Sequence, residues 1–518
     1  MTTTPEAPRR LHPASILFRM AQQVRAFAVP ALLAIFGARS AFASAEIFAF
    51  WLIIPFAAFS LLRHVFFSYR TAEHELEVRS GVLVRNVRHV PYSRIHDLTA
   101  VQNVFHRLFG VVEARIETGA GNKPEATLSV ISLADYEALR RLVFSRREGP
   151  ESHGAEVSEV GSSRTLLHLT PRDTALWGLL RGQVGLVLAA LAGGAWQFGD
   201  GGAGGIGGMA GRLIPSFFRD VVREPTLSWD RVVVVGVSIL GLLLVLRLLS
   251  MLWTMVRFHG FRLTLVGDDV KTEFGLLTRV SASLPNHRIQ AVVVRESPLQ
   301  RRLGRISVRA QTAGGGSAGG ELDGETGQQS AESASLKDRE WLAPILRRDA
   351  LAEFLAPLLS SFDLSAVDWQ PVHPGAVRRA FKSWLRILAV PTLVVTPFLT
   401  PFLGWWTPLA ALPPVLWAWF GARGEIAGLR WALTDGHALL RSGWLWRRLV
   451  IVPIDRVQTV TLHSSPWDRR ARMARVSVDT AGGGALGNPF EVPYLADEVA
   501  IDLAARLERE VAARLFRW

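Results

Sequence analysis

The chain has no cysteine among its 518 residues. This absence excludes a disulfide framework, a thiolate metal site and a cysteine nucleophile. Two sequence patterns of common enzyme sites are also missing, the phosphate loop GxxxxGK(S/T) and the zinc motif HExxH. We therefore expect a protein without enzymatic activity, catalytic residues, cofactor or metal ion.

Acidic residues are fewer than basic ones. The chain has 45 Asp and Glu against 58 Lys and Arg, which gives a formal net charge of +13. A mean hydropathy of +0.22 beside 20% charged residues indicates that apolar and polar stretches are kept apart. Excess arginine could serve nucleic acid, but in a membrane protein it more often retains segments in the cytoplasm and attracts anionic lipid. We expect lipid and not nucleic acid as a partner.

Six apolar segments occur in three pairs. About 20 apolar residues cross the hydrocarbon layer as a helix, so these lengths predict transmembrane helices. Arg181 and Arg247 fall within the second pair, where we expect them to have a structural role. The segments are 24–38 and 47–67, 175–198 and 232–256, and 385–403 and 409–420.

The positions of the arginines predict the orientation. An even number of spans before each polar region places the N-terminus, the polar regions and the C-terminus on one side of the membrane. Nearly all basic residues lie on that side, so the positive-inside rule places it in the cytoplasm. The sequence therefore predicts a multi-pass protein of a bacterial plasma (inner) membrane.

Each polar region contains one copy of a repeat. The first and second copies keep every offset, and the third keeps the spacing from its glycine onward, so all three copies predict one folding unit. In each copy a further arginine follows thirteen residues after the first, at Arg107, Arg301 and Arg469. The signature residues are Gly81, Pro91 and Arg94 in the first copy, Gly275, Pro285 and Arg288 in the second, and Gly443, Pro453 and Arg456 in the third.

The hydrophobic pattern of each repeat predicts strands first and a helix last. Residues 112–118 alternate between apolar and charged, which is typical of a strand with one buried face. The corresponding apolar positions in the other copies are Ile306, Val308 and Ala310, and Ala474, Val476 and Val478. One more strand is expected at 127–131, 341–346 and 490–495, followed by an amphipathic helix at 133–142, 350–355 and 497–507. The expected unit is a small antiparallel β domain closed by a C-terminal helix.

Paired spans followed by a G-x-L strand, a P-x-x-R-I/V turn, a basic R-R/L-x-G segment and a T-A-G-G-like loop resemble the membrane-flanked bacterial pleckstrin-homology-like proteins of the YdbS/YdbT type. The resemblance implies an α+β multidomain membrane protein in which each of three transmembrane pairs precedes a pleckstrin-homology-like (PH-like) domain. It implies no catalytic residues, and in such folds the loops carry binding functions. The chain departs from the pattern at Arg472, where the other copies have Gly110 and Gly304, and in a low-complexity insertion at 316–340 that we expect to be disordered.

The expected organisation follows from these assignments. The segments are a cytoplasmic N-terminal segment (1–23), transmembrane pair 1 (24–67), PH-like repeat 1 (68–146), a linker (147–172), transmembrane pair 2 (173–256) with a Gly-rich outer loop (199–230), PH-like repeat 2 (257–362), a linker (363–382), transmembrane pair 3 (383–421) and PH-like repeat 3 (422–518).

The recurring arginines have two interpretations. A guanidinium group can fix the fold by binding a carboxylate or a carbonyl. Alternatively, basic loops can contact anionic headgroups or partner proteins, each charge contributing about 1 kcal/mol near an anionic surface. The candidates for such contacts are Arg301, Arg302 and Arg305, and Arg469, Arg470 and Arg472. We expect the signature glycines, prolines and arginines to be structural.

The sequence therefore favours a membrane scaffold or sensor that presents three cytoplasmic PH-like modules. Its expected partners are membrane lipids and other membrane or cytoplasmic proteins, including a smaller member of the family. An accessory role in transport or export is the alternative, favoured if the proline-rich third pair encloses a water-filled path. A membrane-bound hydrolase is the third class.

Overall fold

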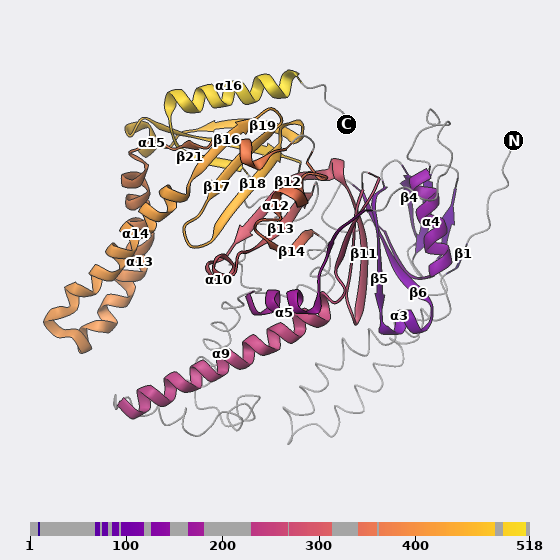
Figure 1. The fold of residues 1–518 in the computed structure, drawn as a ribbon, viewed down its shortest axis with the longest axis horizontal. Coiled ribbons are helices and arrows are strands. Elements are labelled where there is room, and N and C mark those ends of the chain that lie inside the picture. Colours follow the sequence, from indigo (N-terminus) through magenta and orange to yellow (C-terminus); the bar gives the residue numbers. More distant parts are fainter. Residues whose placement is uncertain are drawn as a thin grey trace.

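The computed structural model describes residues 9–10, 68–72, 75–80, 85–92, 95–118, 126–145, 164–180, 229–267, 269–312, 340–359, 362–481 and 490–513. In these parts the chain forms three β-rich modules in series, and two long helical elements project from them (Figure 1). Every strand pair among the described residues is antiparallel.

The first module begins with a four-stranded sheet of β1 (Arg9–Arg10), β2 (Ser68–Thr71), β3 (Glu75–Ser80) and β4 (Asn86–Pro91). Its second part consists of β5 (Ile95–Asn103), α3 (Val104–Leu108), β6 (Val111–Thr118), β7 (Ala126–Ser132) and α4 (Leu133–Ser145).

The second module repeats this order of strands, and helices follow its first strand. Its first part consists of β8 (Arg164–His168), α5 (Pro171–Leu180), α9 (Trp229–Arg257), β9 (Arg262–Val266), β10 (Asp269–Phe274) and β11 (Thr278–Pro285). Its second part consists of η3 (Asn286–Arg288), β12 (Ile289–Glu296), α10 (Pro298–Arg302), β13 (Arg305–Thr312), β14 (Trp341–Arg347) and α12 (Leu351–Leu355).

The third module has the same plan. Its first part consists of η4 (Leu364–Ala366), β15 (Gln370–Pro371), α13 (Ala376–Leu403), η5 (Gly404–Ala411), α14 (Leu412–Gly428), β16 (Arg430–Thr434), β17 (His437–Ser442) and β18 (Arg447–Pro453). Its second part consists of η6 (Ile454–Arg456), β19 (Val457–His463), α15 (Pro466–Arg470), β20 (Met473–Thr480), β21 (Phe490–Ala496) and α16 (Asp497–Ala513).

Two sheets run across the boundaries between modules. One has the strand order β7-β6-β5-β11-β10-β9-β8, and the other has the order β14-β13-β12-β18-β17-β16-β15. The second part of each module is therefore continuous with the first part of the next. Because shared backbone hydrogen bonds join them, the modules form one scaffold instead of three separate domains.

The expected pattern of buried positions is confirmed in all three copies. Ala114 and Ile116 on β6 are fully buried, and so are the matching apolar positions of β13 and β20. The largest core lies in the second module, where Trp177 packs edge-on against Phe258 and Trp341, with ring centroids 4.5 and 5.1 Å away. The last strands are also found where they were expected, at β7, β14 and β21. The closing helices α4 and α16 extend further than predicted, to Ser145 and Ala513, whereas α12 has only five residues.

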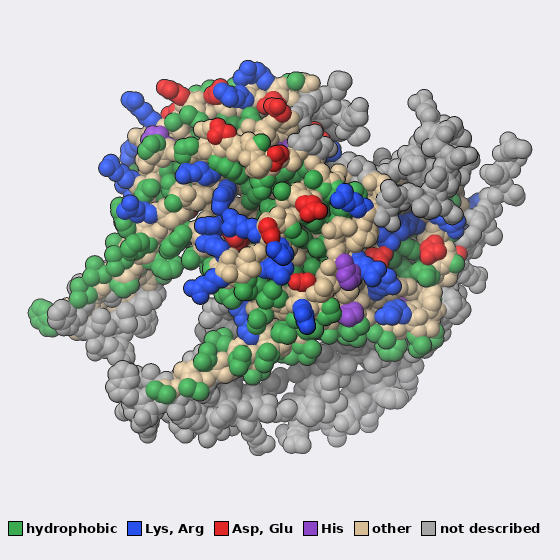
Figure 2. All heavy atoms as spheres, viewed as in Figure 1, with side chains coloured by type: hydrophobic (Ala, Val, Ile, Leu, Met, Phe, Trp, Pro, Cys, Tyr) green, Lys and Arg blue, Asp and Glu red, His purple; other side chains and the backbone are tan. Residues whose placement is uncertain are grey.

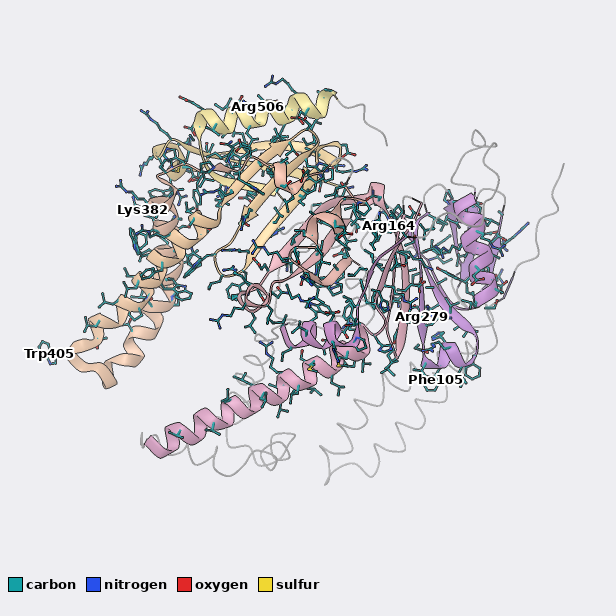
Figure 3. The ribbon with its side chains drawn as sticks, viewed as in Figure 1. Phe105, Arg164, Arg279, Lys382, Trp405 and Arg506 are labelled. Carbon is teal, nitrogen blue, oxygen red and sulfur yellow. The ribbon has the colours of Figure 1, made fainter. Side chains whose placement is uncertain are left out.

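Two apolar arms project from the modules toward the same side (Figure 1). The first arm is α9, and the second arm is the hairpin of α13, η5 and α14. The first arm exposes large apolar side chains along its length, including Val237, Leu240, Leu244 and Leu248. Trp405 lies at the tip of the second arm and is 99% exposed (Figure 3).

The expectation of six transmembrane helices in three pairs is wrong for the described part of the chain, where no helix is long and apolar enough to cross a membrane. Helix α14 has only 17 residues, and α13 begins with several basic residues. The expected segments 24–38 and 47–67, with most of 175–198, lie outside the described residues, as do residues 316–339 of the expected insertion and Arg181.

Candidate contact surface at the module junctions

The two junctions between modules use the same strands in the same register. In the first junction β5 pairs with β11, and Gln102 lies opposite Arg279. In the second junction β12 pairs with β18, and Glu296 lies opposite Arg447. These are corresponding repeat positions, because Pro285 and Pro453 follow Arg279 and Arg447 by six residues each. One docking geometry is therefore used twice.

The recurring arginine fixes each junction. Arg107 Nη1 donates a hydrogen bond to the carbonyl of Leu276, at 3.2 Å. Arg301 Nη2 donates to the carbonyls of Trp444 and Leu445, at 3.1 and 3.0 Å. Both arginines thus cross to the turn that follows the signature glycine of the next module. For this pair the contacts favour the structural interpretation, in which a guanidinium binds carbonyl groups.

A short capped helix holds Arg301 in place. The Ser297 side chain accepts from the Gln300 N–H at 3.2 Å, and the Gln300 side chain accepts from the Ser297 N–H at 2.8 Å, which completes a capping box. Pro298 occupies the first helical turn, where its missing N–H removes no hydrogen bond of the helix. The Gln300 amide also donates to Ser307 Oγ at 2.8 Å, which anchors the helix on β13. Helix α15 begins with the same box at Ser465 and Asp468.

The signature glycines and prolines shape the turns at the junctions. Gly275 and Gly443 have φ values of +112° and +91°, and a Cβ atom on either would lie 1.9 Å from a backbone carbonyl oxygen. Only glycine fits such a turn. Pro285 and Pro453 end β11 and β18 and precede the turns η3 and η6.

The remaining signature residues lie near these turns. Arg288 is buried, and Arg456 Nη2 lies 3.4 Å from Asp455 Oδ2. Pro91 ends β4. Gly81 and Arg94 lie outside the described residues.

Positive charge concentrates at the second junction around one carboxylate. The Glu296 side chain is 8% exposed, and its oxygens lie 3.7 Å from Arg301 Nε, 3.6 Å from Arg348 Nη1 and 3.9 Å from Arg447 Nη1. Burial lowers the pKa of Arg441 nearby, and the charges of Arg447 and Arg348 lower that pKa further. One negative charge therefore faces several positive ones, and the local field favours an added anion. We call Glu296 with these four arginines the junction cluster.

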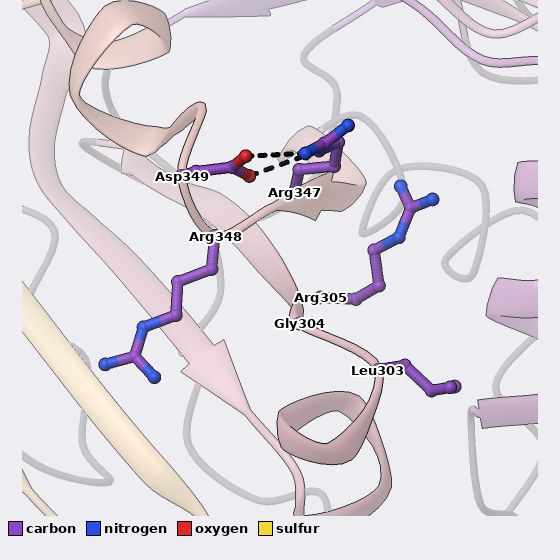
Figure 4. A pocket seen from close by; sticks show the side chains of 6 residues that line it. All are labelled: Leu303, Gly304, Arg305, Arg347, Arg348 and Asp349. Atoms are coloured by element: carbon purple, nitrogen blue, oxygen red, sulfur yellow. Dashed lines mark hydrogen bonds and ion pairs between the residues drawn. The ribbon is translucent and has the colours of Figure 1, made fainter.

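A hollow of 650 Å³ adjoins the junction cluster (Figure 4). It is lined by Leu303, Gly304, Arg305, Arg347, Arg348 and Asp349. Arg347 is bound to Asp349 through two hydrogen bonds of 3.2 and 2.6 Å, and Arg305 Nη1 lies 3.4 Å from Asp173 Oδ1. Arg348 extends away from Arg347 and Arg305, toward Glu296. Arg347 and Arg305 are each paired with a carboxylate, so their positive charges are compensated. The uncompensated positive charge beside the hollow therefore belongs to the junction cluster.

The expected contact arginines do not form basic loops. Arg301 and Arg302 lie in α10 and Arg305 begins β13, whereas Arg469 and Arg470 lie in α15 and only Arg472 lies in a turn. Of the first three, Arg301 reaches across the second junction, whereas Arg305 pairs with Asp173 of its own module. Helix α15, which holds Arg469 and Arg470, lies in the third module, apart from α10 (Figure 1).

Sequence reasoning missed the members of the junction cluster other than Arg301. Arg441 and Arg447 flank the turn at Gly443, and this clustering of basic residues on both sides of a hairpin was the available signal. Glu296 and Arg348 gave no local signal, because distant strands bring them together. Among the described residues, no group of His, Asp and Glu could hold a metal ion. The pattern GxSxG, in which a nucleophilic serine stands in some hydrolases, occurs at residues 315–319, which lie outside the described residues.

The comparisons with known proteins agree with the repeat. The family model of the bacterial PH domain matches three segments, 24–147, 214–340 and 385–513, which together make up most of the chain. The chain is 21% identical over 439 residues to UPF0699 transmembrane protein YdbT of Bacillus subtilis (strain 168), an alignment that covers 82% of each chain. No solved structure matches. The chain therefore belongs to the bacterial PH domain family, with three copies of the domain, and is of the YdbS/YdbT type.

Proposed function

We propose that this protein is a non-enzymatic, membrane-associated scaffold that binds anionic lipid headgroups at the junction cluster. The observation that carries this proposal is the position of the basic surface relative to the two apolar arms. Lys and Arg side chains gather between the base of the first arm and the second module junction, and apolar side chains cover both arms (Figure 2). A surface that joins apolar projections to positive charge matches the chemistry of an anionic bilayer.

The arms supply the apolar part of this contact. Large exposed apolar surfaces on a protein mark contacts with lipid or with other proteins. The full exposure of Trp405 at the tip of the second arm favours lipid, since indole prefers the headgroup layer. The similarity to a protein named a transmembrane protein supports the same assignment.

The junction cluster supplies the polar part. Three of its guanidinium groups lie within 4 Å of a single carboxylate and the fourth, on Arg441, lies nearby, so a phosphate group would meet uncompensated positive charge. Guanidinium forks bind phosphate oxygens in pairs. The cytoplasmic leaflet of a membrane carries a negative surface potential. We therefore place the modules on the cytoplasmic face of the bacterial plasma membrane.

A lipid titration tests this proposal on the full chain in a neutral detergent. Short-chain phosphatidylglycerol should raise the unfolding midpoint, because a ligand present at about 100 times its Kd stabilises the folded state by about 2.7 kcal/mol. Phosphatidylcholine of the same chain length should raise it much less. The phosphatidylglycerol effect should shrink as salt shortens the Debye length from about 10 Å to about 3 Å.

The variants locate the binding site. Arg348→Gln with Arg447→Gln should weaken the phosphatidylglycerol effect, by about fivefold in affinity for each charge removed at about 1 kcal/mol. Arg506→Gln is the matched control, because Arg506 is exposed on α16 and pairs with Asp502 at 2.8 Å, far from the cluster. If phosphatidylglycerol and phosphatidylcholine shift the midpoint equally, or if the control variant loses as much as the double variant, the proposal is wrong.

A further inference from the structure

Within the described part of the chain, two strands lack the neighbour that their counterparts have. β4 corresponds to β11 and β18, and β5 and β12 correspond to β19. Each internal junction pairs a strand of the β5 type with a strand of the β4 type from the next module: β5 with β11, and β12 with β18. Among the described residues, β4 pairs only with β3 and β19 only with β20. The first module therefore has one half of a junction and the third module has the other half.

The exposure of the side chains agrees with these open edges. Ala100 on β5 and Val294 on β12 are 7% and 5% exposed, whereas Leu462, at the same repeat position of β19, is 47% exposed. On the other edge, Val87 of β4 is 43% exposed. Edge strands present unpaired N–H and C=O groups, so each open edge is a template for another strand.

The recurring arginine of the third module also lacks its junction contact. Arg107 and Arg301 donate hydrogen bonds across the two internal junctions. Their counterpart Arg469 is exposed on α15, and its side chain forms no hydrogen bond or ion pair with a described residue. Helix α15 nevertheless has the same capping box as α10, so Arg469 occupies the same position in its helix as Arg301.

We propose that copies of this chain associate head to tail, with β19 of one copy pairing antiparallel with β4 of the next. The register follows from the two internal junctions. Ala100 lies opposite Ser281 and Val294 lies opposite Leu449, and the matching positions of the open edges are Leu462 and Val87. Leu462 therefore lies opposite Val87, and His463 lies opposite Asn86. The contact buries both exposed apolar side chains and repeats the geometry of the internal junctions.

The partner of each open edge is a second copy of this chain, because one chain carries both β4 and β19. The two edges belong to modules at opposite ends of the molecule (Figure 1), so they do not pair within one copy. Such a heterologous contact generates a ring if the rotation closes and an open array if it does not. Strand addition at a sheet edge is a common mode of recognition between chains. The proposal does not depend on lipid binding.

Crosslinking in native membranes tests the proposed register. The chain has no cysteine, so each introduced cysteine is the only thiol. Two differently tagged full-length variants, Val87→Cys and Leu462→Cys, are expressed together and treated with an oxidant or a short thiol crosslinker. Directly opposed residues have Cβ atoms about 4.5–5.5 Å apart, so the mixed pair should crosslink efficiently. Asn103→Cys with Thr278→Cys in one chain is the positive control, because these residues are paired across the first junction.

One negative control and three contrary results decide the outcome. Val87→Cys with Ile501→Cys should not crosslink, because Ile501 on α16 is even more exposed than Leu462 but lies outside the proposed contact. Crosslinking of Val87→Cys with itself at the same yield would indicate a symmetric contact and would overturn the proposal. The proposal is also wrong if the mixed pair stays uncrosslinked while the positive control reacts, or if Val87→Cys reacts only with a different, shorter protein of the same membrane.

Discussion

Replacing Gly275 with alanine should destabilise the second module much more than the same change at another glycine with a positive φ. Gly275 has a φ of +112°, and its added Cβ atom would lie 1.9 Å from the carbonyl oxygen of Thr278. The left-handed conformation alone costs about 1–2 kcal/mol for a residue with a side chain. The clash is with backbone, so no side-chain rotation relieves it and the turn must open.

Opening this turn removes contacts on both sides of it. The N–H groups of Gly275 and Leu276 donate to the carbonyls of His259 and Val256, at 2.9 and 3.0 Å, and the carbonyl of Leu276 accepts from Arg107. Each hydrogen bond contributes about 1 kcal/mol net. The conformational cost and the loss of these three hydrogen bonds together should lower the free energy of unfolding of Gly275→Ala by about 4–5 kcal/mol.

Gly260→Ala is the matched control. Gly260 has a φ of +64°, but no atom lies within 4 Å of the position that an added Cβ atom would take. This variant should lose only the conformational cost of about 1–2 kcal/mol. Denaturant unfolding of both full-length variants in detergent, followed by tryptophan fluorescence, measures the difference. Equal losses in the two variants would refute the proposed turn geometry.

Three further predictions concern single side chains. Trp177→Ala should cost about 3–5 kcal/mol of unfolding free energy, because this buried ring packs against Phe258 and Trp341; a loss under about 1 kcal/mol would contradict the core described above. Arg472→Gly should raise the stability of the third module by about 0.5–1 kcal/mol, because Arg472 has a φ of +51° at the position of Gly110 and Gly304; lower stability in chemical unfolding would contradict this. Burial raises the pKa of Asp468, but hydrogen bonds from Ser465 and Arg379 lower it more, so the net pKa lies below its ordinary value. The ionised carboxylate therefore stabilises the fold above the ordinary pKa of about 3.9, and this contribution is lost as the pH falls through the folded-state pKa. Asp468→Asn should flatten the decline of the unfolding midpoint between about pH 5 and pH 2, and an unchanged decline would contradict the assignment.

The repeated unit could be predicted from the sequence because its signals are local. The alternation at Ile306, Val308 and Ala310 predicts a strand with one buried face, and the fixed offsets from Gly275 to Pro285 and from Gly443 to Pro453 predict one turn geometry. The structure confirms these features. The short helices α3, α10 and α15 were missed because five residues show no helical periodicity, although the pattern from Ser297 to Gln300 was available as a capping signal.

The junctions could not be predicted in this way. Asn103 on β5 pairs with Thr278 on β11, which lies 175 residues further along the chain, and the pattern of each strand shows which face is buried but not which strand lies beside it. Glu296 is adjacent to Arg295 in sequence, and only the pairing of β12 with β18 brings Arg447 to it. The junction cluster is thus a product of tertiary structure.

The membrane contact of the two arms is tested most directly by measuring the surroundings of single labelled sites. Because the chain has no cysteine, an environment-sensitive fluorophore can be attached at Leu244→Cys on the first arm, Trp405→Cys on the second arm or Arg506→Cys on α16. The full chain is then reconstituted into vesicles that contain a lipid with a quencher on its acyl chain. Our account predicts strong quenching at residues 244 and 405 and little at 506. Weak quenching at both arm sites, equal to that at 506, would contradict it.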